Sequence, residues 1–228
     1  MIAESVGDAP PDEVPARLCE VVVRLLPLSG ASASLRSDGV PMRLCATGER
    51  AGRLAEIQAT LGDGPCVHAA RTGAPVLALD LTAAPDADRW PVFAQQAAAA
   101  GVRAVYALPL GSDAVCVGTL DLYRDSPGGL SGEELRTARL VAGVMTMALA
   151  ALPHRADDER PDARSWLNGL ATGHDQIHQA IGMIMAQLGV GSEEALARLR
   201  GDAFARSRTV HEAAEDVITH RQRLGPDD

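Results

Sequence analysis

Hydrophobic positions recur along the chain with two different periods, and this pattern predicts a mixed first part followed by a helical second part. Val14, Leu18, Val21, Val22 and Leu25 have the spacing of one helix face. Short alternating runs and turn-rich segments then predict strands separated by helices. The predicted elements are helices over 12–26, 51–61 and 91–100 and strands over 31–36, 42–47, 75–80, 103–110 and 114–123.

A long apolar helix is predicted to close the first part of the chain. Ser131 and Glu134 have the spacing of a capping box, in which each side chain bonds the backbone N–H of the other residue. The apolar run that follows ends near Leu152. Strands in antiparallel order with helices at both ends indicate an α+β domain over 12–152, an antiparallel sheet flanked by helices that cover one face.

The composition changes abruptly after that helix. The segment from Pro153 to Asp162 contains two prolines and many charged residues, with almost no apolar side chain. Such a segment is typical of a boundary between domains. We therefore expect a linker over 153–163 and a second domain over 164–225.

Three helices are predicted in this second domain. Gly189 and Gly191 are expected to end the first, Ser192 to cap the second, and a capping box of Thr209 and Glu212 to begin the third. Short amphipathic helices can bury their apolar faces only against one another, so an all-α three-helix bundle is predicted. The expected apolar faces are Ile177, Ala180, Ile181, Ile184, Met185 and Leu188; Ala195, Leu196, Leu199, Ala203 and Phe204; and Val210, Ala213, Ala214, Val217 and Ile218.

Composition and charge narrow the possible functions. No apolar run is long enough for a transmembrane helix, and the acidic N-terminus is unlike a secretory signal, so a cytoplasmic protein without a membrane partner is expected. The net charge of −9 repels phosphate, so any nucleic-acid contact needs a local basic patch. The four scattered cysteines lack metal-ligand spacing and predict neither a disulfide framework nor a bound metal.

The C-terminal part, from about residue 166 to 224, resembles the ANTAR domain, an RNA-binding module of bacterial transcription antiterminators. The resemblance implies a homodimer that binds tandem RNA stem-loops, with no DNA expected as a partner. It runs through all three predicted helices, at 177–185 (IHQAIGMIM), 192–195 (SEEA), 199–200 (LR), Ala203, 213–214 (AA) and 217–218 (VI).

Candidate RNA-binding residues follow from this resemblance and from the local charge. They are His174, His178, Gly182, Arg200, Arg206 and Arg208. ANTAR sequences often carry a lysine where this chain has Ile181 and an arginine near the place of His174, and both changes remove positive charge from the expected RNA face. Fewer phosphate contacts lower affinity and flatten its dependence on salt.

Two of these features have an alternative interpretation. Gly182 in a helix interior costs about 0.5–1 kcal/mol relative to alanine, so it indicates a close approach, either by another helix or by the RNA backbone. Arg206 and Arg208 flank the second turn beside His211 and form either a basic patch or an ordinary charged surface.

The N-terminal part resembles a GAF domain of the kind that precedes ANTAR modules. The matching segments include 61–66 (LGDGPC), 73–76 (GAPV), 89–93 (RWPVF), 108–110 (LPL) and 118–123 (GTLDLY). The resemblance implies a sensor that binds a small molecule over one face of its sheet, and it identifies no particular ligand or cofactor. The candidate pocket residues are Gly64, Cys66, Trp90 and Phe93.

Cys66 has three possible roles: it lines a ligand site, it senses redox state, or it is a buried structural cysteine after the 62–65 turn. The chain as a whole is not expected to be an enzyme, because no catalytic triad, phosphate-binding glycine loop or metal cluster is visible. The predicted function is a signal-responsive RNA-binding antitermination regulator. The alternatives are a protein-interaction regulator without RNA binding and a GAF-fold thiol reductase that uses Cys45, Cys66 and Cys116.

Overall fold

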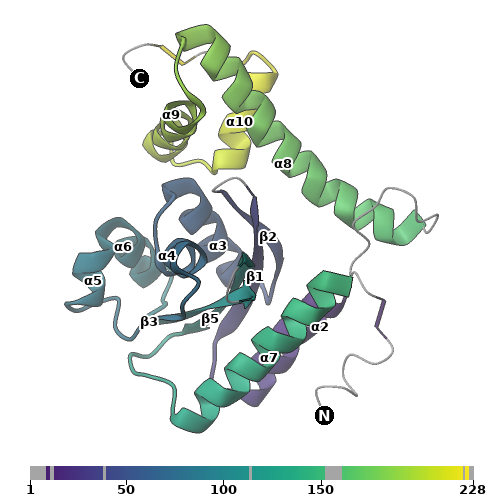
Figure 1. Ribbon diagram of the computed structural model, residues 1–228. Helices are drawn as coiled ribbons and strands as arrows, with labels where there is room; N and C mark the ends of the chain where they lie inside the picture. The colour runs from purple at the N-terminus through teal and green to yellow at the C-terminus, as the bar shows by residue number, and fades with distance from the viewer. Residues whose placement is uncertain are drawn as a thin grey trace.

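The computed structural model describes residues 9–10, 13–37, 40–112, 115–151, 161–222 and 224–225, without the side chains of Ser37 and of residues 151–174. An α+β domain comes first and a helical bundle lies against one end of it (Figure 1). None of the described helices has the length and apolar character that a membrane span requires.

The α+β domain is built on five antiparallel strands in the order β2-β1-β5-β4-β3. Central pairing joins β1 to β5, with Ala33 opposite Leu120, and β5 to β4, with Leu120 also opposite Leu108. The strands are β1 (Gly30–Ser37), β2 (Val40–Ala46), β3 (Val76–Ala78), β4 (Ala104–Gly111) and β5 (Cys116–Arg124). The helices are α2 (Val14–Leu25), α3 (Glu49–Leu61), α4 (Pro65–Thr72), α5 (Asp86–Arg89), α6 (Pro91–Ala99) and α7 (Gly132–Ala151).

Helices cover both faces of the sheet, so the expectation of one covered face is wrong. On β4, Tyr106 and Leu108 point into a core closed by α2 and α7, whereas Val105 and Ala107 point into a second core closed by α3, α4 and α6. The strand is therefore apolar on both sides, and a pattern without alternation is the mark of a sheet buried on two faces.

Local signals at helix ends explain several boundaries. The predicted capping box at the start of α7 is confirmed: the Ser131 N–H donates to Glu134 Oε2 and the Glu134 N–H donates to Ser131 Oγ. Gly62 ends α3 in the left-handed conformation, with φ +64°. The helix after the glycine turn, α4, begins with Pro65, because proline fits the first helical position.

The bundle consists of α8 (Pro161–Leu188), α9 (Ser192–Ala205) and α10 (Val210–Ile218). Its core contains most of the predicted apolar faces, and Gly189 ends α8 at φ +69°. Three details differ from the expectation. Met185 and Phe204 are exposed, and α9 begins at Ser192 with Gly191 as an N-cap that makes no side-chain bond. The predicted linker lies mostly outside the described residues, and its last three positions already belong to α8.

Candidate functional site

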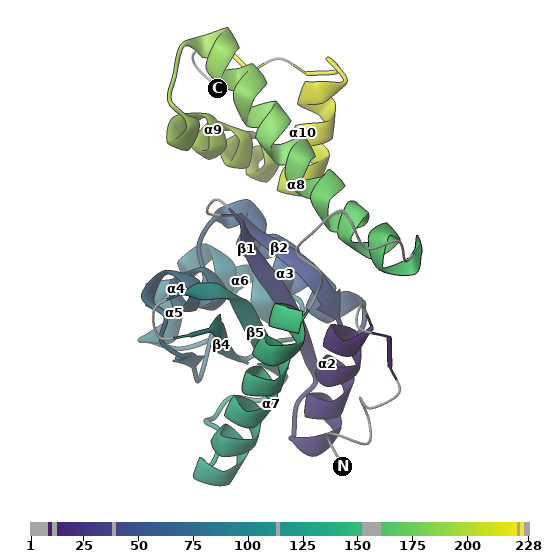
Figure 2. The same ribbon diagram turned by 45° about the vertical axis from the view of Figure 1, so that its right-hand side comes forward.

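The bundle is docked on the α+β domain through α3 and β2. The backbone N–H of Val210, at the start of α10, donates to Thr60 Oγ1 over 3.1 Å, and Arg200 Nε of α9 donates to the carbonyl of Ala59 over 3.2 Å. Ala59 and Val40 are buried in the apolar core of the bundle itself. In both views α9 and α10 lie over the end of the domain formed by α3 and the β1–β2 hairpin (Figure 2).

The Arg200 side chain passes over Gly62 and reaches a cavity at this end of the α+β domain. A Cβ added at Gly62 would lie 2.5 Å from Arg200 Nη1, closer than atoms can approach without a shift. Glycine is therefore favoured here for two reasons, the left-handed conformation at the end of α3 and the guanidinium that lies above it. Burial lowers the pKa of Arg200, although a guanidinium remains charged at physiological pH.

A cavity of about 230 Å³ opens beside this contact, between β1, β5, α4 and α9. Cys66 and Thr119 form part of its inner wall, and three arginines, Arg36, Arg71 and Arg200, line it. Arg36 Nη1 donates to the carbonyl of Ala70 over 3.0 Å, which holds that side chain across β1 toward α4. The cavity thus has a largely neutral interior and a cationic lining from two parts of the chain.

A buried polar cluster lies behind the cavity wall. Gln58 Oε1 accepts from the Cys66 backbone N–H over 2.8 Å and so caps α4 from outside. Neither carboxyl oxygen of the fully buried Asp121 has a hydrogen-bond partner among the described residues. Burial raises the pKa of Asp121 to about 7, and the polar groups of Thr119, Cys66 and Gln58 oppose that shift.

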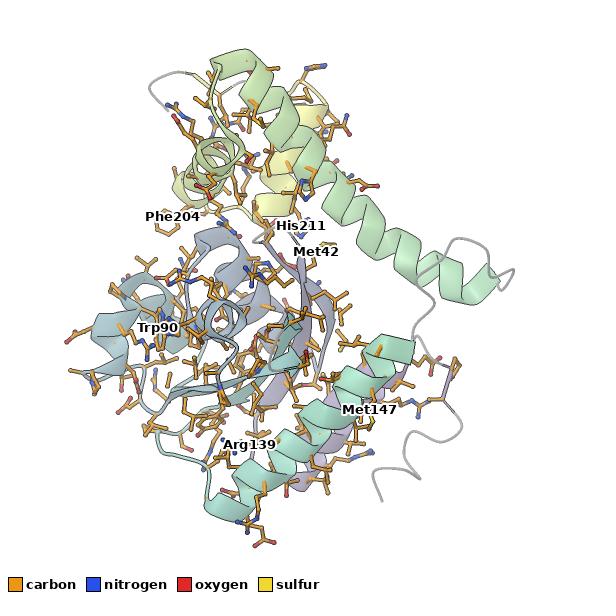
Figure 3. The ribbon with its side chains drawn as sticks, viewed as in Figure 1. Met42, Trp90, Arg139, Met147, Phe204 and His211 are labelled. Atoms are coloured by element: carbon orange, nitrogen blue, oxygen red, sulfur yellow. The ribbon has the colours of Figure 1, made fainter. Side chains whose placement is uncertain are left out.

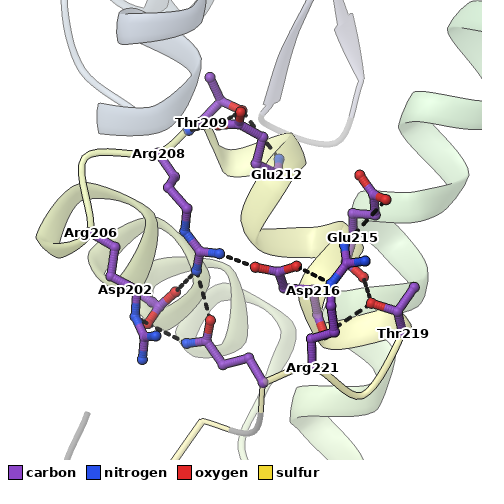
Figure 4. Close-up of polar contacts among 10 residues, drawn as sticks. Asp202, Arg206, Arg208, Thr209, Glu212, Glu215, Asp216, Thr219 and Arg221 are labelled. Carbon is purple, nitrogen blue, oxygen red and sulfur yellow. Dashed lines mark hydrogen bonds and ion pairs between the residues drawn. The ribbon is translucent and has the colours of Figure 1, made fainter.

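An ion-pair network joins α9, α10 and the residues that follow (Figure 4). Arg208 binds both Asp216 and Asp202, and Asp202 also pairs with Arg206 Nε over 2.8 Å. Arg221 donates to Asp216 Oδ1, and this hydrogen bond lowers the pKa of that carboxyl. The positive charges of Arg206 and Arg208, in the turn between α9 and α10, are therefore largely neutralised by aspartates of the bundle.

The outer face of α8 is open. Gly182 is exposed, and in the described part of the chain no heavy atom apart from its own helix backbone lies within 4 Å of the position a Cβ would take. Gln179 and Ala186, one turn away on either side, are exposed as well. Met185, also one turn from Gly182, is exposed as well, so polar and apolar side chains surround the glycine, and this face is not covered by another helix of the described bundle.

Comparison with known families agrees with this arrangement of a sensor-like domain and a helical bundle. Residues 8–150 match the GAF domain family and residues 167–218 match the ANTAR domain family. The chain is a GAF and ANTAR domain-containing protein. These two families place it among signal-transducing regulators of transcription antitermination, with RNA binding as the property of the ANTAR family. No curated protein matches the chain.

Solved structures support the GAF fold of the first domain. The GAF domain of an Acinetobacter phosphoenolpyruvate-protein phosphotransferase matches with a TM-score of 0.53 and 10% identity, covering 70% of this chain and 93% of that one. The corresponding domain from Coxiella burnetii gives 0.51 and 16%, covering 65% and 88%. A domain of a putative two-component sensor histidine kinase from Sinorhizobium meliloti gives 0.50 and 16%, covering 63% and 92%. At these identities the likeness concerns the fold alone.

The predicted RNA-binding residues are divided between three places in the ANTAR domain. His178 and Gly182 lie on α8, Arg200 is docked on the GAF domain, and Arg206 and Arg208 belong to the ion-pair network. The helix-packing interpretation of Gly182 is wrong within the described chain, because nothing packs against it. The side chain of His174 lies outside the described side chains.

The predicted pocket residues do not all lie at one site. Cys66 lines the cavity, whereas Trp90 and Phe93 are buried in the core behind α4 and α6. Trp90, labelled in Figure 3, is covered by the Arg89 guanidinium at 4.4 Å from the ring centre, and Arg89 also bonds His68. Gly64, at φ +128°, makes room for Gln58, since a Cβ there would lie 2.7 Å from Gln58 Oε1.

The thiols do not converge as the reductase alternative requires. Cys45 Sγ lies 3.4 Å from Cys19 Sγ on the α2–α7 side of the sheet, and Cys66 lies in the core on the opposite side. Burial raises the pKa of Cys66, which disfavours a reactive thiolate. This environment fits the interpretation of Cys66 as a buried cysteine at the cavity wall.

Sequence reasoning missed Thr60, Asp121 and Asp202. Thr60 is a single threonine at the end of an amphipathic helix, and nothing local marks it as a partner for α10. Asp121 carried a weak signal, because an acidic residue stands between Leu120 and Leu122 in an otherwise apolar strand. Asp202 could have been paired with Arg206 from its i, i+4 spacing alone.

Proposed function

We propose that this protein is a cytoplasmic, homodimeric regulator that binds tandem RNA stem-loops through its ANTAR domain and responds to a small molecule through its GAF domain. The observation that supports this most is the ANTAR match, which extends over α8, α9 and α10. The open position at Gly182 on α8 supports it further, since a helix position without a side chain allows a sugar–phosphate backbone to approach closely.

Dimerisation is proposed to use the exposed apolar face of α7. Leu140 and Met147 of α7 are 59% and 65% exposed, although both are large and apolar. Figure 3 shows Met147 on α7, well away from the docked bundle. Large exposed apolar side chains on a helix of this kind are typical of an association surface.

Signal transfer is proposed to use the direct contact between the domains. Arg200 and Val210 of the ANTAR domain bond to Ala59 and Thr60 of the GAF helix α3, next to the cavity. A ligand that shifts α3 or α4 changes these bonds without any need for the linker to carry the change. The docked state and an undocked state are then the two conformations that a ligand biases.

The test is a titration of a tandem stem-loop RNA with the full chain at two salt concentrations. We expect saturable binding that weakens as salt rises, because each phosphate contact releases counterions. Arg206→Gln removes an exposed positive charge without removing Arg208, and we expect it to weaken RNA binding. Arg17→Gln on α2 is the matched control and should leave RNA affinity unchanged. Absence of saturable binding at low salt would overturn the proposal.

A protein-interaction regulator without RNA binding is the second candidate. One observation favours it: Arg206, Arg208 and Arg221 are all paired with aspartates or glutamates of the bundle, which leaves little net positive charge at the second turn. The same titration separates the two candidates, since an ANTAR-shaped protein-binding module gives no salt-dependent RNA binding.

A further inference from the structure

We propose that the cavity between the two domains binds a small anion, a carboxylate or phosphate compound, and that Arg36, Arg71 and Arg200 hold it. Because Arg200 belongs to the ANTAR domain, the bound anion keeps the two domains docked and acts against RNA binding. Binding of the anion does not depend on RNA binding, whereas the effect of the anion on RNA affinity rests on the proposed function.

All the charged side chains that line the cavity are cationic. Twelve residues line the cavity, and its charged members are three arginines with no aspartate or glutamate among them. Within the described residues, neither Arg36 nor Arg71 forms an ion pair. The chain as a whole carries −9, so a purely cationic lining runs against its average. Guanidinium groups match the planar, two-oxygen edge of carboxylate and phosphate.

The size and the wall of the cavity suit a small anion. Its volume of about 230 Å³ admits a small molecule, and the wall combines hydroxyls of Ser34 and Thr119 with the apolar side chains of Leu35 and Val67. Asp121, directly behind Thr119 and Cys66, is the nearby carboxyl that would repel an anion. Its burial without hydrogen-bond partners raises its pKa to about 7, so at neutral pH about half of it is protonated and it repels an anion less than an ordinary carboxylate does.

Arg200 links the cavity to the contact between the two domains. Its guanidinium lies against Gly62 and its Nε donates to Ala59, so the docked bundle brings this charge to the cavity edge. A ligand that contacts Arg36 and Arg71 on one domain and Arg200 on the other binds the docked state more tightly than an undocked one. Linkage then requires that any partner that needs Arg200 released binds less well when the anion is present.

Calorimetric titration of the full chain with succinate and, separately, with inorganic phosphate tests the site without RNA. We expect saturable binding of at least one of these anions in the millimolar range, and the arm that binds identifies the headgroup. Arg200→Gln and the double variant Arg36→Gln/Arg71→Gln should each weaken it about 10- to 100-fold, the usual loss for a hydrogen bond to a charged group. Arg17→Gln makes the same charge change on α2 and should leave binding unchanged.

The double variant tests the site without disturbing the docking contact, because Arg36 and Arg71 are exposed and neither takes part in that contact. Weaker anion binding in the double variant therefore does not come from undocking or misfolding of the bundle. Binding of neither anion, or equal affinity in wild type and both variants, overturns the site. The RNA titration repeated at saturating anion tests the coupling and should show weaker RNA binding for wild type but not for Arg200→Gln. A chain that binds the anion and no RNA would contradict the proposed function and leave the site standing.

Discussion

At Gly182, helix stability and the proposed close approach of RNA make opposite demands. A side chain at this position would meet nothing in the described chain, so Gly182→Ala should stabilise α8 by about 0.5–1 kcal/mol through helix propensity. If the glycine serves close approach of RNA, the same variant should bind RNA more weakly. Urea unfolding and RNA titration of one variant check both effects, and higher stability with unchanged RNA affinity would remove Gly182 from the RNA face.

Asp121 predicts a pH dependence of stability. At pH 3 and below, both the folded and the unfolded chain carry most of the proton, so the residue has little effect. As the pH rises toward 7 the unfolded chain ionises first, since the folded pKa is raised to about 7, and stability falls by up to about 4 kcal/mol before levelling off.

Asp121→Asn should remove this part of the pH dependence. The free energy of unfolding of wild type and variant, measured in urea at pH 5 and pH 8, should differ more at pH 8, with the variant the more stable. Asp88→Asn changes an exposed carboxyl on α5 and serves as the control. A wild type and an Asp121→Asn variant with parallel pH profiles would show that Asp121 is ionised in the folded protein.

At the scale of elements, α9 and α10 depend on Arg208 more than on Arg206. Arg208 bridges Asp202 on α9 and Asp216 on α10, whereas Arg206 is 54% exposed and pairs with Asp202 alone. Arg208→Ala should cost about 1–3 kcal/mol because it leaves two partly buried carboxylates without their bridge. Arg206→Ala should cost roughly 0–1 kcal/mol, as exposed pairs do.

Thermal unfolding of the two variants checks this difference, and equal losses would contradict it. The result also governs how RNA experiments are interpreted. Loss of RNA binding in Arg208→Ala reports on the bundle's integrity, whereas loss in Arg206→Ala reports on an exposed charge.

The elements themselves were largely predictable because their signals are local. The capping boxes at Ser131 and Thr209 formed as expected, since every atom involved lies within four residues. Exposure of Phe204 and Met185 was not predictable, because helical periodicity locates an apolar face but not how wide a face the neighbouring helices cover. The short helix α5 carried no periodic signal in its four residues.

At the scale of the whole molecule, the site depends on contacts that no local pattern encodes. Thr60 and Val210 are 150 residues apart, and Arg200 and Ala59 are 141 apart. The sequence therefore indicated which residue types matter, among them Cys66 and Arg200, but could not indicate that these two line one cavity. The docked arrangement holds Arg200 in the domain contact, so the RNA contact proposed for this residue would compete with docking.

The RNA affinity of Thr60→Val in the full chain tests directly whether docking of the two domains opposes RNA binding. Valine keeps the shape of threonine but leaves the buried Val210 N–H without its acceptor, which weakens docking by about 1–3 kcal/mol. Thr72→Val, at an exposed hydroxyl that bonds within its own helix, is the matched control. We expect RNA binding at least about fivefold tighter in Thr60→Val than in the control. Equal or weaker RNA binding by a folded Thr60→Val protein would contradict it.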